Sequence, residues 1–357
     1  MSYPSLLPSH AELLKEGTVI PAHPLALTNE RKLDERRQKL LTQYYIASGA
    51  GGVAVGVHTT QFEIRKPEIN LLGSVLQLAA DQIRDSNPQR PFLKVAGIVG
   101  TTTQALKEAE LALKHGYHLG LVSMGGLNDL SESDLIKRLE AISEVIPVFG
   151  FYLQPAVGGR LLSYDFWKDA AALPNLYAIK VAAFNRYQTL DVVRAVCASD
   201  RRDEIALYTG NDDNIVADLL TTYRCTVNGK VIEKKFVGGL LGHWATWTGA
   251  AVELLKRIKS SANDDRSIAE LLTIGIQVTD MNAAIFDPAN SFHGCIPGIH
   301  EVLRRQGLLE GTWCLNPDEK LSQGQAEEID RVCRDYPELV DDQEVKLFLE
   351  KTLSHQY

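Results

Sequence analysis

A lysine stands inside an otherwise apolar run of the chain. Residues 176–183 read LYAIKVAA, and Lys180 is the one charged side chain among them. If this run is a buried strand and Lys180 faces the inside, loss of solvation lowers the pKa of the amine. A neutral amine is what attack on a ketone requires. If the side chain points outward, its ammonium group reaches water between helices, and the run alone leaves both orientations open.

A tyrosine at the end of another apolar run, 148–155, could assist such a lysine. The phenol of Tyr152 could pass protons to and from a group at Lys180 during imine formation. The alternative is a core aromatic side chain whose hydroxyl finds a different partner.

Two threonines follow the apolar run 51–58. Successive backbone N–H groups at Thr59 and Thr60 could bind a carboxylate, with the two hydroxyls as further donors. The alternative is a turn closed by side-chain-to-backbone hydrogen bonds.

Histidines and acidic residues follow other runs. His23, His58 and His243 could together hold zinc with one open position, although isolated histidines more often bond to the backbone. Asp212 and Asp213 could cap a helix or contact a substrate.

The elements that must position these residues form a regular series. Short apolar runs alternate with amphipathic helical stretches, such as the one after Asp34, a residue suited to helix capping. Eight strand and helix units in about 240 residues predict a (β/α)₈ TIM barrel, whose active site lies at the carboxyl ends of the strands. The open doubly wound sheet is the alternative, but no GxGxxG follows any strand. The predicted strands are 17–27, 51–58, 92–100, 119–125, 148–155, 176–183, 205–210 and 237–243.

Beyond residue 260 the pattern is helical only. We predict a barrel over residues 1–260 and a C-terminal helical extension packed on it over 261–357. The expected helices of this extension are 267–282, 299–306, 323–336 and 343–354.

An Asn-Gly pair lies within residues 224–236 and is flanked by alternating side chains. This pattern predicts a β-hairpin with a type I′ turn just before the eighth strand. A surface excursion is the simpler interpretation, and a subunit contact or a flap over the pocket is the alternative.

Composition narrows the class of protein. The 357 residues are 45% hydrophobic and carry a formal net charge of −8, which disfavours binding to nucleic acid or to an anionic membrane. The five cysteines form no CxxC pair, as expected of reduced thiols in a cytosol. We find no secretory signal and no apolar run long enough for a membrane helix, so we expect a cytoplasmic protein.

Several motifs, taken in order, resemble the dihydrodipicolinate synthase and N-acetylneuraminate lyase family over most of the chain. The run 48–60, SGAGGVAVGVHTT, resembles the family segment that ends in Gly-Thr-Thr-Gly-Glu. The run 152–159, YLQPAVGG, matches Tyr-Asn-x-Pro-x-x-x-Gly at its tyrosine, proline and last glycine. Ala178-Ile-Lys180 resembles the Gly-Ile-Lys that carries the Schiff-base lysine, and 209–213, TGNDD, resembles Ser-Gly-Asp-Asp.

The resemblance implies a role for each matching residue. Lys180 would form the imine, Tyr152 would relay protons, and Thr59 and Thr60 would hold the carboxylate and complete the relay. The substrate-binding set would be Thr60, His58, Leu153, Val157, Gly210 and His243. The resemblance also implies a homodimer or homotetramer, and a reaction that needs no metal and no organic cofactor.

This reading predicts a class I lyase or aldolase acting on pyruvate or a longer 2-oxo acid, with an aldehyde as the other reactant in some reactions. Departures from the family pattern argue against a true dihydrodipicolinate synthase: Leu153 replaces the Asn, and Val157 stands where those synthases place an arginine. Both replacements predict a second substrate that is less polar at that end. The alternatives are a metal-dependent barrel hydrolase or lyase and a barrel that binds a 2-oxo acid without turnover.

Overall fold

The structure is a computed structural model that describes residues 3–261 and 264–354. The eight predicted strands are all present in one sheet, and helices alternate with them along the chain. This pattern confirms the predicted (β/α)₈ barrel with C-terminal helices. The strands are β1 (Val19–Pro21), β2 (Gly52–Val55), β3 (Leu93–Ile98), β4 (Leu119–Val122), β5 (Val148–Leu153), β6 (Leu176–Ala182), β7 (Ala206–Thr209) and β10 (Phe236–Leu241).

The chain divides into two compact units. The first comprises residues 3–18 and 93–240, and the second comprises 19–92 and 241–354. The boundary predicted at residue 260 divides the barrel from the C-terminal helices. It does not coincide with the division between these two units, and it stays a prediction.

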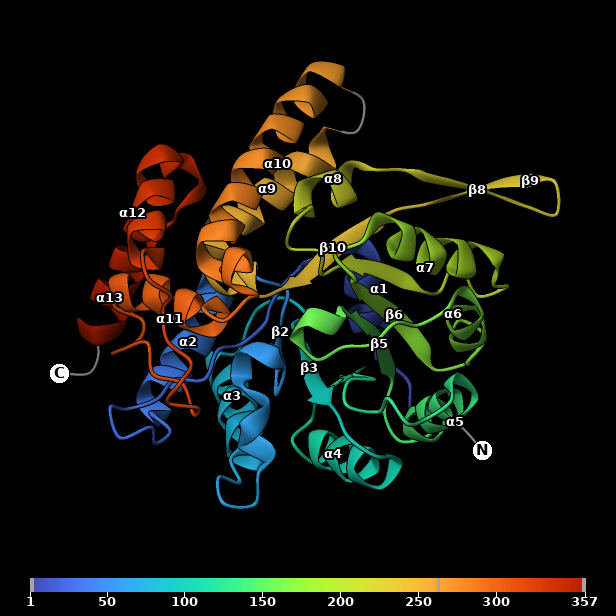
Figure 1. The fold of residues 1–357 in the computed structure, drawn as a ribbon, viewed down its shortest axis with the longest axis horizontal. Helices are drawn as coiled ribbons and strands as arrows, with labels where there is room; N and C mark the ends of the chain where they lie inside the picture. Colours follow the sequence, from blue (N-terminus) through green and yellow to red (C-terminus); the bar gives the residue numbers. More distant parts are fainter. Residues whose placement is uncertain (1–2, 262–263, 355–357) are drawn as a thin grey trace. The chain divides into compact units, whose positions relative to one another are not determined.

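In the first unit the strands are parallel and lie in the order β10, β7, β6, β5, β4, β3. Their side chains are almost all buried, as expected of parallel strands covered on both faces. Helices α4 to α7 run beside the strands in Figure 1. The helices of this unit are α1 (Pro8–Glu16), α4 (Thr102–Lys114), α5 (Glu132–Ser143), α6 (Tyr164–Ala170), α7 (Arg186–Ala198) and α8 (Ile215–Leu220).

The predicted hairpin is present. Strands β8 (Tyr223–Val227) and β9 (Lys230–Lys234) pair antiparallel, and Asn228 and Gly229 between them have φ of 50° and 76°. Two positive φ angles are what a type I′ turn requires. The hairpin packs on α7 and its tip extends past that helix in Figure 1, which agrees with a surface excursion.

The second unit holds β1, β2 and most of the remaining helices. As predicted, Asp34 caps the first helix after β1, with its carboxylate accepting a hydrogen bond from the Arg37 N–H at 3.0 Å. The four helices expected after residue 260 are confirmed as α10 to α13. The long helix α10 packs against α11 and α12. The helices of this unit are α2 (Glu35–Ala47), α3 (Leu72–Ser86), α9 (Thr248–Ser260), α10 (Asp265–Phe286), α11 (Cys295–Arg305), α12 (Gln325–Asp335) and α13 (Asp342–Ser354).

In the part of the chain that the structure describes, the helices are all too short or too polar to cross a membrane.

Candidate active site

Lys180 lies on the face of the sheet that is turned away from helix α6. On β6 it pairs in register with Phe151 of β5 and Tyr208 of β7, and paired residues of parallel strands project to the same side. Its amine nitrogen, Nζ, lies 4.6 Å from the centre of the Phe151 ring. In a (β/α)₈ fold the face away from the helices is the inside of the barrel. The inward orientation left open by the sequence is therefore the one observed.

The surroundings of Lys180 favour a neutral amine. The residue is 8% exposed, and burial lowers the pKa of its amine to about 8, although the nearby Asp212 carboxylate opposes this shift. At pH 7.5 roughly a quarter of such an amine is neutral, against about one part in a thousand for an ordinary lysine. Lys180 can therefore act as a nucleophile close to neutral pH.

Gly210 lets the lysine reach this position. A Cβ added to Gly210 would lie 2.5 Å from Cε of Lys180 and 2.9 Å from Cβ of Ala182. Any larger residue at the end of β7 would therefore occupy the space of the lysine side chain. Gly210, expected to line the substrate, lies against the nucleophile itself.

Tyr152 does not meet Lys180 in the structure. It follows Phe151 directly on β5, so it projects to the opposite face of the sheet. There its ring packs on Trp167 of α6 at 5.5 Å between centroids. Its hydroxyl donates to the carbonyl of Leu162 and accepts from the N–H of the same residue, both at 3.3 Å. The expected contact between the phenol and the amine is therefore wrong for this conformation, and the alternative of a core aromatic with another partner is the one observed.

Leu153 shares the face of Lys180, one pleat closer to the carboxyl end of the strands. It pairs in register with Ala182 and is buried, so β5 presents an apolar side chain just beyond the lysine. Val157 is half-buried in the 3₁₀ turn Pro155–Val157 that follows. That turn depends on Gly159, because a Cβ there would lie 1.8 Å from the Leu153 carbonyl oxygen.

Asp212 is the residue that the sequence interpretation undervalued. It is 5% exposed and close enough to Lys180 to act on its charge. Helix α8 has Asn214 at its N-cap position, so the capping role considered for Asp212 is not observed. The signal that could have found it is its position directly after β7, the strand paired with β6, at the carboxyl ends of the strands where barrel active sites lie.

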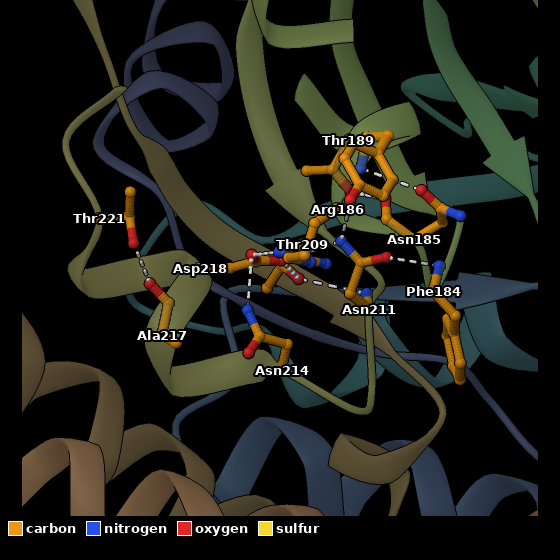
Figure 2. Close-up of polar contacts among 11 residues, drawn as sticks. Phe184, Asn185, Arg186, Thr189, Thr209, Asn211, Asn214, Ala217, Asp218 and Thr221 are labelled. Atoms are coloured by element: carbon orange, nitrogen blue, oxygen red, sulfur yellow. Dashed lines mark hydrogen bonds and ion pairs between the residues drawn. The ribbon is translucent and has the colours of Figure 1, made fainter. Parts of the chain in front are cut away.

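A buried polar cluster holds the segment around Asp212, and Figure 2 shows its members. The carboxylate of Asp218, which is fully buried, accepts hydrogen bonds from Thr209 Oγ1 at 2.7 Å, Asn211 Nδ2 at 2.9 Å and Asn214 Nδ2 at 3.1 Å. It also forms an ion pair with Arg186 at the start of α7. Donors from β7, from the β7–α8 segment and from α7 thus converge on one carboxylate.

Asn211 links this cluster to the segment after β6. Its Oδ1 accepts a hydrogen bond from the N–H of Phe184 at 2.9 Å, and Phe184 has φ of 50°. Its Nδ2 also reaches Thr189 Oγ1 at 3.3 Å. Because Asn211 lies between Gly210 and Asp212, both ends of its side chain fix the backbone that presents these two residues to Lys180.

The threonines predicted to bind a carboxylate lie in the 3₁₀ turn His58–Thr60 of the second unit. The Thr60 hydroxyl donates to the His23 carbonyl at 2.7 Å and accepts from the N–H groups of Gly56 and Val57 at 3.0 and 3.2 Å. The Thr59 hydroxyl also reaches the His23 carbonyl, at 3.3 Å. The turn-closing interpretation is therefore observed for Thr60.

His23 and His243, both in the second unit, lie next to polar side chains of their own surroundings. The His23 ring lies between Thr42 Oγ1 at 2.9 Å and Gln38 Nε2 at 2.9 Å, and burial lowers its pKa to about 4. His243 is buried, its pKa is likewise lowered to about 4, and its Nδ1 lies 3.5 Å from Asn282 Nδ2. Within residues 3–261 and 264–354, no group of three or more His, Cys, Asp or Glu side chains is placed to hold a metal ion. The three histidines, including His58, therefore do not form the zinc triad that was considered.

Comparison with known proteins gives a likeness in structure. No protein-family model and no curated protein sequence matches the chain. Dihydrodipicolinate synthase from Oceanobacillus iheyensis superposes with a TM-score of 0.72 at 16% identity, over 92% of this chain and 99% of that one. N-acetylneuraminate lyase from Fusobacterium nucleatum, complexed with pyruvate, gives 0.70 at 17% identity over 90% and 98%. A Clostridium difficile protein described as CdNal, in complex with mannosamine, gives 0.70 at 14% identity over 90% and 99%. The chain therefore has the fold of the dihydrodipicolinate synthase and N-acetylneuraminate lyase proteins, as its motifs implied.

Proposed function

We propose that this protein is a class I lyase or aldolase in which Lys180 forms a Schiff base with pyruvate or a longer 2-oxo acid. The observation that carries the proposal is the buried, inward-facing Lys180 with a pKa of about 8. The names of the structural neighbours support the same chemistry, since they include lyases and one complex with pyruvate.

The chemistry follows from the amine. Neutral Lys180 attacks the ketone carbon, and loss of water gives a protonated imine. The imine withdraws electrons from C3, so a carbanion can form there. Retro-aldol cleavage produces that carbanion by breaking the C3–C4 bond, whereas condensation with an aldehyde and loss of water start from it. No metal or organic cofactor is required.

The second reactant is less polar than that of a dihydrodipicolinate synthase. Support comes from Leu153, an apolar side chain on the inner face of β5, and from Val157, which offers no guanidinium to a carboxylate. That Thr59 and Thr60 bind a carboxylate, and that His58 and His243 contact the substrate, stay predictions from the sequence. A homodimer or homotetramer and a cytoplasmic location stay predictions.

Borohydride trapping tests the imine. The protein is incubated with pyruvate or longer 2-oxo acids, reduced, digested and mapped by mass spectrometry. We expect one adduct, at Lys180, and none in K180M. K234M is the matched control, because Lys234 is also partly buried and its pKa is also lowered by burial. An unlabelled Lys180 with every 2-oxo acid tried would refute the proposal.

A barrel that binds a 2-oxo acid without turnover is the second candidate. One observation favours it: the aromatic residue facing Lys180 on β5 is Phe151, which has no hydroxyl, while the Tyr152 hydroxyl is bonded to Leu162. Trapping at Lys180 without any proton exchange or cleavage would support this candidate.

A further inference from the structure

Imine formation needs a side chain beside Lys180 that can donate and accept protons. The strands next to the lysine supply few such side chains. On the inner face of the first unit, β5 contributes Phe151 and Leu153, and β6 contributes Ala182. None of these side chains can carry a proton. Tyr208 pairs with Lys180 on β7, but its hydroxyl donates to the Leu14 carbonyl at 3.0 Å, in α1.

Asp212 is a titratable residue of the same unit, and its charge acts on the lysine. It lies two residues after Gly210, in the turn that follows β7, and a Cβ added to Gly210 would lie 2.5 Å from Cε of Lys180. Asp212 is 5% exposed, and its charge acts on the Lys180 amine, with little competition from water. The Asn211 and Asp218 cluster holds the backbone on one side of it.

From this placement we propose, building on the proposed function, that Asp212 is the acid–base residue of the Schiff-base reaction, in place of a tyrosine from β5. The group is a catalytic residue because it exchanges protons with the reacting atoms. Asn211 and Asp218 are positioning residues that act through it.

The proton transfers balance with this one carboxyl group. Asp212 takes a proton from the Lys180 ammonium, leaving a neutral amine and a neutral carboxyl group. The amine adds to the ketone carbon, and its extra proton passes to the alkoxide to give a carbinolamine. Asp212 protonates the carbinolamine hydroxyl, which leaves as water while the C=N bond forms. The resulting carboxylate then takes a proton from C3; the C–H electron pair forms the C2=C3 double bond, and the C=N π pair moves to the nitrogen to give an enamine.

Pyruvate allows imine formation and proton transfer to be measured separately. Borohydride trapping reports the imine, and loss of the pyruvate methyl signal in D₂O, followed by proton NMR, reports removal of a proton from C3. We expect D212N to form the adduct at Lys180 more slowly but still to form it on long incubation, and to lose exchange by about 10²- to 10⁴-fold, the usual contribution of general acid–base catalysis. D213N is the matched control, since Asp213 is the adjacent and exposed aspartate, and it should keep both activities.

A purely structural role is tested by chemical rescue. D212A leaves space for a small carboxylic acid, so added formate should restore exchange in a concentration-dependent way. Exchange by D212N at the wild-type rate would overturn the inference. So would a folded D212N that traps no pyruvate at any pH, because Asp212 would then place the lysine and not move protons. These results differ from failure of the proposed function, in which the wild-type protein itself gives no adduct.

Discussion

The amine of Lys180 lies 4.6 Å from the centre of the Phe151 ring on the neighbouring strand. An aromatic face attracts a cation, and this attraction is worth about 0.5–2 kcal/mol depending on desolvation. The contact therefore favours the ammonium form and partly offsets the burial that lowers the pKa of the lysine.

Replacing Phe151 by Leu should lower the pKa of Lys180 further, by up to about one unit. The neutral amine would then persist to lower pH, and the pH profile of borohydride trapping should move toward acid. F149L is the control, because Phe149 lies on the same strand but packs against Tyr208. Equal shifts in the two variants would show that the ring does not act through the lysine charge.

Replacing Gly210 by Ala should displace the lysine without unfolding the protein. The new methyl group would lie 2.5 Å from Cε of Lys180, and a flexible side chain can move away more easily than backbone can. We expect a loss of about 1–3 kcal/mol of stability from overpacking and a large fall in the rate of trapping. G73A, in α3, adds a methyl group where no atom lies within 4 Å, and it should trap normally.

Stability should depend on pH through Lys180. Its folded pKa of about 8 lies below the ordinary 10.5, so between these values the unfolded chain binds more protons and stability rises with pH. Below pH 8 the lysine is charged in the folded protein, so the full free-energy cost of burying the ammonium group lowers the stability. K180M should therefore be more stable than wild type at pH 7, by about 3 kcal/mol at most, and the difference should shrink as the pH rises toward 10.5. Urea unfolding at pH 7 and 9.5 measures this, and a difference that does not change with pH would contradict it.

Removal of the Tyr152 hydroxyl should leave the chemistry intact. Because that hydroxyl is bonded to Leu162 on the helix side of the sheet, Y152F should lose about 1 kcal/mol of stability and keep the wild-type rate of methyl proton exchange. Loss of exchange by the 10²-fold or more typical of a general acid–base would show instead that the tyrosine changes face when substrate binds.

Much of the fold follows from local patterns. The eight strands and the Asn228-Gly229 hairpin were predictable because apolar runs, caps and turn residues encode each element nearly independently of its partners. The placement of Lys180 on the sixth strand was equally clear. The motif order across the chain also implied the family whose fold the structure has.

The direction of each strand side chain came from the tertiary structure alone. Both faces of a buried parallel strand are apolar. Hydrophobicity therefore does not indicate whether the odd-numbered or the even-numbered side chains of the strand point inward. Phe151 and Tyr152 are adjacent on β5 and so project to opposite faces of the sheet. Phe151 lies beside the lysine, and Tyr152 packs against α6. The sequence did not show the role of Asp212 either, because only the fold brings the turn after β7 close to Lys180. Residue types and motif order indicate which side chains could react, whereas packing sets which of them face one another.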